Sequence, residues 1–478
     1  MQAFNPYRAF DNVYNISKFH RIQGSQGLLD AAEYIYEHLN LKEKEMIFYK
    51  YDGESTYGNF VAPMGWDPVR GELIADGKKL IGFDDVPLFI CGHSPSGDVE
   101  GVVTSDLEAS DGKILLTSAR DAKREYLKAV KRGAQAVIFY SDTLPETAVP
   151  YRGLFLTKKE LSYPLPAVAI PRNLVEKIKG QKVRINVETR TEPKKMPVIY
   201  ARTGSKFLVS SHMCHPFPGA NDNASGAGLS LELANAGARA DFLWIPEHYG
   251  SLAFFSNHDV SYEFGLNLDM VGENQAITGS TLQISYTPYS QKSPYEELVK
   301  ELVRDLDSSA IRYEFVDYDI GSDHAVLVQN GIPAMDFTNW PDRYYHSSED
   351  FADKVSTDML SFVGRVVMSF LSHEVPIYLE EAWRAKYKAY LLAKFGREDA
   401  EKLGALRKAK YRNFLPTASP YITPENADEF PDVWGKGAAY AEFDNLSTQL
   451  GEEDALRIAA KAYGVKPEEL SSLKEYFR

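Results

Sequence analysis

The sequence predicts an α/β fold, and three observations support this prediction. Apolar segments that are typical of buried strands end in polar residues, as at 207–209, 242–245 and 332–337. Residues 56–195 contain short alternating segments separated by Gly, Asp and Pro, which predicts a β-rich region. Residues 376–478 have charged and aromatic residues at helical spacing. The chain therefore divides into an α/β part, a β-rich part and a helical part.

The N-terminal region, residues 1–55, contains a predicted helix. Apolar residues recur at helical spacing from Leu28 to Leu39, and the preceding Gly24–Gly27 segment is typical of a turn that opens such a helix. In the β-rich region 56–195, residues 121–132 have the charged, amphipathic pattern of a helix. Residues 136–140 follow as an apolar strand.

The α/β part spans residues 196–375, and a helical accessory segment follows at 376–478. Within that segment the spacing predicts helices over 379–394, 452–463 and 467–477, whereas 416–434 has no clear period. Its aromatic residues, which include Trp383 and Trp434, are typical of packing or of a subunit interface. We therefore expect a homo-oligomer contact, if one exists, to involve this segment.

The polar residues after the first core strand form the most informative motif of the chain. Ser211–Pro216 contains His212 and His215, and Pro218–Gly226 contains Asp222 among small residues. A strand that ends in histidine, followed by a turn that carries an aspartate, offers imidazole and carboxylate to a metal at the carboxyl edge of a sheet. The alternative is a polar loop between a strand and a helix, capped by Asn and Asp.

Further candidate ligands lie at the ends of the other predicted strands. The apolar segment 260–268 runs into Asp269, and the segment 242–245 is followed by Glu247 and His248. His346 lies in a polar loop after the strand predicted at 332–337. Each of these residues alone is more typical of an ordinary surface or core position. Their recurrence at successive strand ends favours a shared site.

The ordered set of motifs resembles the co-catalytic zinc aminopeptidases, a family that includes aminopeptidase Y, glutamate carboxypeptidase and glutaminyl cyclase relatives. The resemblance covers roughly residues 12–52 and 196–375, and it implies a zinc exopeptidase fold, a mixed central sheet flanked by helices. It also implies one metal held by His212, Asp222 and Asp269, and a second held by Asp222 and His346. The cofactor implied is Zn²⁺, as one or two ions, or another divalent metal.

The chemistry of the residues agrees with this resemblance. Two metals about 3.5–4 Å apart need a bridging carboxylate, and zinc accepts His nitrogen and carboxylate oxygen. A carboxylate outside the ligand set must move a proton between water and the leaving amine. We expect Glu247 to be that base, although a glutamate at the start of a helix also suits the helix dipole without any catalytic role.

Two departures from the family pattern leave residue roles open. Cys214 stands where the family has an Asp that steadies the first imidazole, and it could be a buried thiol or a ligand. His215 could bind metal in place of, or beside, His212. His248 stands in the position of a paired glutamate and could be the second-site ligand. Alternatively Glu247 is itself a ligand, or only one metal binds.

Asp323 occupies the position of another family motif, Ser-Asp-His. Its side chain is expected either to support the metal ligands through hydrogen bonds or to cap the helix that follows, and both can hold together. Glu273 and Asp342 are candidates to bind a substrate's amino terminus only because they lie near ligands in the sequence.

The region 56–195 resembles the protease-associated domain that is often inserted in these peptidases. The resemblance rests on Gly133–Ile138, on Leu165–Ile170 and on a closing strand at 183–187. It implies a domain that walls the active-site cleft and restricts substrate size. The alternative is a β-rich insertion with a structural role only.

Composition limits the partners of the chain. Its 67 acidic and 53 basic residues give a formal net charge of −14, which argues against nucleic acid or an anionic membrane as a partner. Cys91 and Cys214 are the two cysteines, too few for a disulfide framework. The sequence shows no signal pattern at its start and no long apolar run, so a cytoplasmic location is expected.

The sequence thus predicts a zinc-dependent exopeptidase, an aminopeptidase that hydrolyses N-terminal residues of peptides by metal-activated water. Three alternatives remain: an acyltransferase of the glutaminyl cyclase type, a deacylase of N-acyl amino acids, and a non-catalytic binding protein. A deacylase would favour Arg or Lys in the pocket for the substrate carboxylate. Side-chain preference and oligomeric state are not determined by the sequence.

Overall fold

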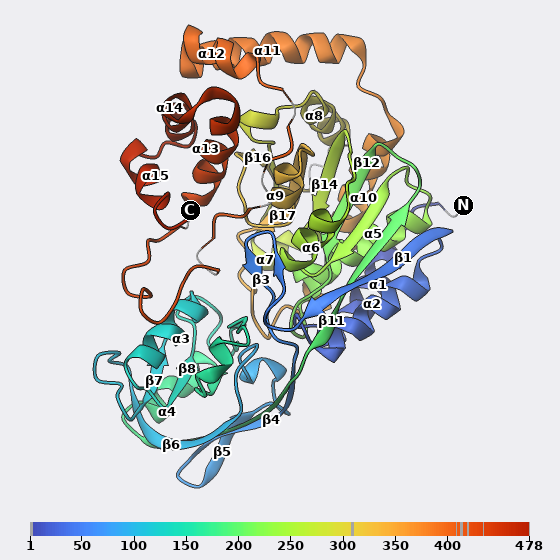
Figure 1. The fold of residues 1–478 in the computed structure, drawn as a ribbon. Coiled ribbons are helices and arrows are strands. Elements are labelled where there is room, and N and C mark those ends of the chain that lie inside the picture. Colours follow the sequence, from blue (N-terminus) through green and yellow to red (C-terminus); the bar gives the residue numbers. More distant parts are fainter. Residues whose placement is uncertain are drawn as a thin grey trace.

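The computed structural model describes residues 3–306, 310–407, 409–411, 414–417, 420–433 and 435–477. Figure 1 shows three groups of elements: a sheet flanked by helices, a second sheet below it, and a set of helices that ends the chain. None of the helices within these ranges is both long and apolar enough to cross a membrane. Trp434, one of the aromatic residues that we expected to pack, lies outside the described residues.

The first sheet, called the main sheet below, is mixed, as predicted. Its described strands lie in the order β1-β11-β13-β12-β14-β17-β15-β16. Their bounds are β1 Glu43–Tyr51, β11 Lys194–Arg202, β12 Phe207–His212, β13 Asp241–Ile245, β14 Phe264–Leu268, β15 Thr281–Ser285, β16 Tyr313–Val316 and β17 Ala334–Trp340. The neighbours β13, β12, β14 and β17 are parallel, and β1 and β11 pair antiparallel at one edge.

The parallel strands place the polar motifs together. Val209 of β12 pairs with Phe242 of β13 and with Leu266 of β14, so the three strands run in register. These strands are buried on both faces and are rich in apolar residues, and buried polar side chains on them are paired, as Ser210 is with Asn267. Because their carboxyl ends meet at one edge, the residues that follow each strand converge there.

Helices cover the main sheet. Their bounds are α1 Pro6–Ile16, α2 Gln26–His38, α5 Gly226–Asn235, α6 Tyr249–Asn257, α7 Gln275–Thr278, α8 Tyr295–Asp305, α9 His324–Gln329 and α10 Thr357–Ser372. Ser356 caps α10 with its hydroxyl, and Phe370 of that helix packs on Phe207 of β12 and Phe264 of β14. Gly228 lets α5 approach α1, because a Cβ at this position would lie 2.8 Å from the Val13 nitrogen.

The second sheet is built from the residues between β1 and β11. Its described strands lie in the order β5-β4-β10-β6-β7-β8-β9, with both parallel and antiparallel neighbours. The bounds are β4 Trp66–Ala75, β5 Lys78–Gly82, β6 Gly97–Thr104, β7 Ile114–Thr117, β8 Ala136–Phe139, β9 Ala167–Ala169 and β10 Lys182–Thr191, with helices α3 Ala122–Lys131 and α4 Val175–Ile178. The hairpin of β2 Thr56–Tyr57 and β3 Phe60–Val61 precedes it.

The second sheet is an insertion in the topological sense. Tyr51 at the end of β1 pairs with Lys194 at the start of β11, so the chain leaves and re-enters the main sheet at one place. We call residues 52–193 the inserted region. Its assignment as a protease-associated domain stays a prediction.

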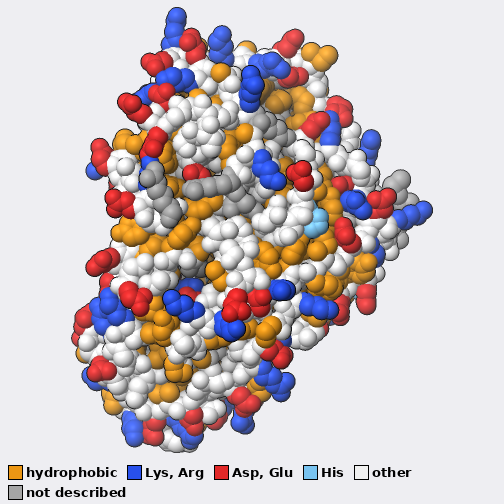
Figure 2. Space-filling model, viewed as in Figure 1, with side chains coloured by type: hydrophobic (Ala, Val, Ile, Leu, Met, Phe, Trp, Pro, Cys, Tyr) orange, Lys and Arg blue, Asp and Glu red, His pale blue; other side chains and the backbone are white. Residues whose placement is uncertain are grey.

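The C-terminal segment contacts both other parts. Its helices are α11 Ile377–Phe395, α12 Arg397–Gly404, α13 Gly437–Leu450, α14 Glu452–Tyr463 and α15 Pro467–Leu473. Glu442 of α13 accepts hydrogen bonds from the backbone N–H of Tyr289 (3.1 Å) and of Ser290 (2.7 Å), on the side of the main sheet. Asp428 forms ion pairs with Lys131 and Arg132 of the inserted region. In Figure 2 acidic and basic side chains are interspersed over the visible face.

Candidate metal centre

Two groups of potential ligands meet at the carboxyl edge of the main sheet. In the first, the Nε2 atom of His212 lies 3.1 Å from Oδ1 of Asp269 and 3.4 Å from Oδ1 of Asp222. His212 is the last residue of β12, and Asp269 directly follows β14. All three side chains are buried, so their charges are poorly screened by water. Such a group of imidazole and carboxylate could hold a metal ion.

The second group shares Asp222 with the first. The Nε2 atoms of His215 and His346 each lie 3.2 Å from Oδ2 of Asp222. The two oxygens of Asp222 are thus divided, with Oδ1 toward the first group and Oδ2 toward the second. A carboxylate in this arrangement has the geometry to bridge two metal ions.

The loop that carries Asp222 is held from two sides. The buried guanidinium of Arg21 donates hydrogen bonds to the backbone carbonyls of Pro218 (2.9 Å) and Gly219. From the other side, the carboxylate of Asp350 accepts hydrogen bonds from the backbone N–H of Asn221 (2.9 Å) and of Asp222 (3.0 Å). These contacts fix the position of the shared carboxylate without using its own oxygens.

Gly219 is required by a close approach in this loop. Its φ is +51°, a conformation that favours glycine, and a Cβ at this position would lie 2.4 Å from Nδ1 of His215. Any larger residue would therefore displace the His215 imidazole.

Backbone carbonyls orient the two neighbouring imidazoles. The Nδ1 atom of His212 lies 3.1 Å from the carbonyl of Cys214, and Nδ1 of His215 lies 2.9 Å from the carbonyl of Pro216. Each ring therefore directs its Nε2 toward Asp222, as a metal ligand needs. The carbonyl of Cys214 does here what the aspartate side chain would do in the family pattern. The Cys214 thiol accepts a hydrogen bond from the backbone N–H of Glu247 (3.1 Å).

The electrostatics of the site suit a cation. Burial raises the pKa of Asp222, but the imidazoles of His215 and His346 lower it well below its usual value, so the carboxyl group is ionised. Burial also raises the pKa of Glu247, as do the carboxylates of Asp269, Asp323 and Asp222. Carboxylates concentrated in a buried site repel one another, and a divalent ion among them would offset this repulsion. The donor set therefore fits the zinc predicted from the sequence.

Glu247 lies in a tight turn after β13, next to the first group. Its backbone carbonyl accepts a hydrogen bond from the side chain of Gln23 (3.0 Å), which comes from the N-terminal region. The next residue, His248, has a φ of +57°, and its N–H donates to Oδ1 of Asp323 (2.8 Å). The turn is thus fixed on both sides of Glu247.

Asp323 supports this turn and does not cap the helix that follows it. Its Oδ1 accepts hydrogen bonds from the His248 N–H and from the hydroxyl of Ser251 (2.5 Å). No side-chain hydrogen bond caps α9. Burial raises the pKa of Asp323 to about 6. Asp323 therefore holds the turn after Glu247, and its hydrogen bonds reach neither the cap position of α9 nor one of the potential metal ligands.

His248 lies outside both groups of potential ligands among the described residues. Its ring centre is 6.4 Å from that of Phe60, and burial lowers the pKa of His248 to about 4. The sequence suggested His248 for the second site and His215 for a place in or beside that of His212; of these two histidines the structure brings His215 to Asp222, in the group that contains His346.

The carboxylates suggested for the substrate's amino terminus lie away from solvent. Glu273 is 1% exposed and Asp342 is 7% exposed. Burial and the neighbouring Asp342 raise the pKa of Glu273 to about 10, so its carboxyl group is protonated at neutral pH. Neither side chain is therefore placed to bind a charged amine.

Sequence reasoning missed three side chains next to the second group. Asp350 holds the Asp222 loop through two backbone N–H groups, a role that no local sequence pattern indicates. The ring of Tyr345 stacks on that of His346, with centres 3.7 Å apart. Tyr151, from the inserted region, contacts both His215 and His346. Tyr345 could have been noticed as the neighbour of His346, but nothing in the sequence relates Tyr151 to the site.

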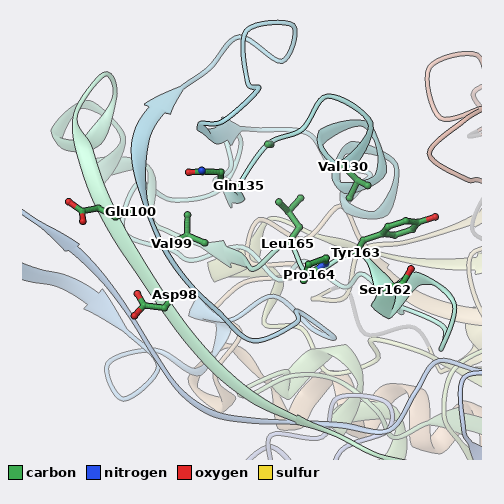
Figure 3. A pocket seen from close by; sticks show the side chains of 10 residues that line it. Asp98, Val99, Glu100, Val130, Gln135, Ser162, Tyr163, Pro164 and Leu165 are labelled. Carbon is green, nitrogen blue, oxygen red and sulfur yellow. The ribbon is translucent and has the colours of Figure 1, made fainter.

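A pocket of about 430 Å³ lies in the inserted region (Figure 3). Its lining residues include Asp98, Glu100 and Tyr163. Both acids are engaged in ion pairs, Asp98 with Arg184 and Glu100 with Lys182. None of the potential metal ligands lines this pocket, so it is separate from the metal centre.

Comparisons with known proteins agree with this fold. Residues 197–371 match the model of peptidase family M28. The structure resembles a Clostridium acetobutylicum protein described as a peptidase, with a TM-score of 0.58 and 15% identity over 98% of this chain and 94% of that one. It also resembles the zinc aminopeptidase BSAP of Bacillus subtilis, with a TM-score of 0.57 and 18% identity over 78% and 95%.

A third similar structure is the aminopeptidase of Aneurinibacillus sp. strain AM-1, with a TM-score of 0.51 and 22% identity over 78% of this chain and 96% of that one. At these identities the likeness shows a shared fold. No curated protein matches the chain by sequence.

Proposed function

We propose that this chain, which matches the model of peptidase family M28 over residues 197–371, is a zinc-dependent aminopeptidase. The observation that carries the proposal is the division of the Asp222 carboxylate. Its Oδ1 lies toward His212 (3.4 Å), and its Oδ2 lies toward His215 and His346 (3.2 Å each). A bridging carboxylate between two groups of zinc-compatible ligands is what a two-metal hydrolase needs.

The potential ligands form two sets of three residues, and both sets contain Asp222. One ion would be held by His212, Asp222 and Asp269, and the other by His215, Asp222 and His346. Three protein ligands leave a coordination position for water or substrate, which is characteristic of catalytic zinc. Zinc, when bound there, polarises the substrate carbonyl and lowers the pKa of water.

Glu247 is the general base in this proposal. Its backbone is fixed by Cys214 on one side and by Gln23 on the other, so its side chain is held near the first ligand group. Glu247 would accept the proton of the attacking water and deliver it to the leaving amine. Asp323 is a positioning residue, because it acts through the N–H of His248 and does not itself contact the ligands.

The charge of the site supports an amine-bearing substrate. The site is rich in carboxylates, and the chain as a whole carries a formal net charge of −14, which favours a cationic amino terminus. A deacylase would need a cation for the substrate carboxylate. The guanidinium of Arg21 is bound to the carbonyl of Pro218, and that of Arg152 to the carbonyl of Tyr151. These contacts weigh against the deacylase alternative.

The test uses zinc-reconstituted protein and a pool of short peptides, half with free and half with acetylated amino termini. We expect sequential release of residues from the free peptides only. Glu247→Gln should lower kcat by about 10²–10⁴-fold, because the base is lost while the zinc ligands stay. Glu146→Gln, an exposed acid of the inserted region, is the control and should match the wild type.

Cleavage of acetylated peptides at an equal rate would overturn the aminopeptidase assignment. Release of ammonia from peptides with an N-terminal glutamine, without hydrolysis of any peptide, would indicate the cyclase type of acyl transfer instead. Turnover that Glu247→Gln leaves unchanged would remove Glu247 from the mechanism.

A further inference from the structure

The inserted region reaches the metal centre through a short strand-like pairing. Tyr151 donates its backbone N–H to the carbonyl of His346 (2.7 Å), and Ser348 donates its N–H to the carbonyl of Val149 (2.9 Å). The Val149 N–H donates in turn to the hydroxyl of Ser348 (3.0 Å). The loop that carries His346 is therefore held against a segment more than 190 positions earlier in the chain.

The side chain of Tyr151 continues this contact onto the ligands themselves. Its ring centre lies 5.1 Å from that of His215 and 5.1 Å from that of His346, with interplanar angles of 68° and 67°. Such edge-to-face contacts favour one orientation of each ring. Tyr345 stacks on the His346 ring as well, so the imidazole is restrained by two aromatic rings.

His346 is the ligand that most needs such restraint. Its side chain is 36% exposed, whereas those of His212, His215 and Asp222 are at most 5% exposed. Its φ is +53°, in the left-handed region that non-glycine residues adopt only when their surroundings impose it. Because His346 lies on a loop and not at a strand end, its position depends on what packs against it.

Gly153 preserves the space for the Tyr151 side chain. A Cβ at Gly153 would lie 2.9 Å from the hydroxyl oxygen of Tyr151 and 2.5 Å from Cε2 of Phe155. The Tyr151 ring, packed in this way, lies against His215 and His346 of the second ligand group and limits their movement.

We propose that Tyr151 of the inserted region is a positioning residue for His346 and His215, so that the inserted region is needed to hold the second zinc ion. This inference rests on the proposed function, because it assumes that the two ligand groups bind zinc. It distinguishes the two ions: the ring of Tyr151 contacts His215 and His346 of the second group, whereas the first group takes His212 from the end of β12 and Asp269 from the residue after β14.

The experiment titrates zinc into the metal-free full chain and measures the number of ions bound and both dissociation constants. Tyr151→Ala should weaken the second zinc about 10–100-fold and leave the first unchanged, the effect expected when a ligand loses its support. Tyr151→Phe keeps the ring and should stay within about 2-fold of the wild type. Tyr163→Ala is the matched control, because Tyr163 is a half-buried tyrosine of the same region that lines the remote pocket of Figure 3.

Unchanged affinity for both ions in Tyr151→Ala would overturn the proposal, as would an equal weakening of both ions or a similar loss in Tyr163→Ala. A weakened second zinc in Tyr151→Phe would also contradict the proposal, because this variant keeps the aromatic ring that is proposed to position the two histidines. The readout is metal binding, so a protein that binds two zinc ions without cleaving peptides would refute the peptidase assignment and leave this inference standing.

Discussion

At the residue scale, the metal centre depends on one carboxylate and on the backbone around it. Asp222 faces two ligand groups, while Arg21 and Asp350 hold its loop through main-chain atoms. The carbonyl of Cys214 orients His212, so this chain needs no aspartate at that position. The unusual residues of the motif are therefore compatible with an intact site, because the backbone supplies the contact that an aspartate side chain supplies in the pattern that the sequence resembles.

The assignment of the second-site ligand is testable with two alanine variants. His215→Ala removes an imidazole 3.2 Å from Asp222 and should reduce bound zinc from two ions to one. His248→Ala removes a ring that lies outside both groups and should retain two ions. Zinc content after dialysis, measured by elemental mass spectrometry, checks both. The opposite pattern, loss of zinc in His248→Ala alone, would make His248 the ligand.

At the element scale, α13 is attached to the rest of the molecule through a buried carboxyl group. Glu442 is fully buried and accepts hydrogen bonds from the N–H groups of Tyr289 and Ser290. Burial nevertheless raises its pKa from 4.5 to about 7. A carboxyl group whose pKa is higher in the folded state binds a proton more readily there. Its contribution to stability is therefore largest below pH 4.5 and declines as the pH rises to 7.

The variant Glu442→Gln should remove this pH dependence. Relative to the variant, the wild type should lose about 3 kcal/mol of unfolding free energy between pH 4.5 and 7.5, the order of magnitude that the shift implies. Urea unfolding of both proteins across this range measures the difference. Glu453→Gln, an exposed residue of α14, serves as the control and should follow the wild type. A constant difference between Glu442→Gln and the wild type at every pH would contradict the prediction.

At the scale of the whole molecule, the metal centre joins distant parts of the chain. Its ligands follow or end strands of the main sheet or lie on loops, and the inserted region packs against one of these loops. The C-terminal segment contacts the inserted region through Asp428, which lies between α12 and α13, and the main-sheet part through Glu442 of α13. Bound zinc should therefore stabilise the assembled molecule and not a single element.

Removal of zinc should lower the free energy of unfolding. A ligand that binds only the folded state stabilises it by about 4 kcal/mol when its free concentration is 1,000 times its Kd. Chelation also leaves the buried Asp222 and Asp269 without a counter-ion. We expect a lower urea midpoint in chelator than in zinc. In Asp222→Ala, which lacks the shared ligand, the two midpoints should coincide. A wild-type midpoint that does not respond to chelation would argue against zinc at this site.

The sequence by itself determined the class of fold and most of the candidate ligands. Strands that are buried on both faces are rich in apolar residues, so the apolar segments before His212 and Asp269 were recognisable, and a mixed main sheet was confirmed. The helix predicted over 452–463 coincides with α14. These features depend on local periodicity, which a single sequence records.

Only the tertiary structure decided which side chains meet. His215 and His248 are equally good zinc ligands by residue type. His248 lies outside the ligand groups because of the turn after β13, where Asp323 accepts a hydrogen bond from the His248 N–H. Tyr151 reaches the ligands because an inserted region folds back onto the loop of His346. Contacts between residues so far apart in the chain depend on how strands, loops and inserted parts pack together, and local sequence patterns carry no information about that packing.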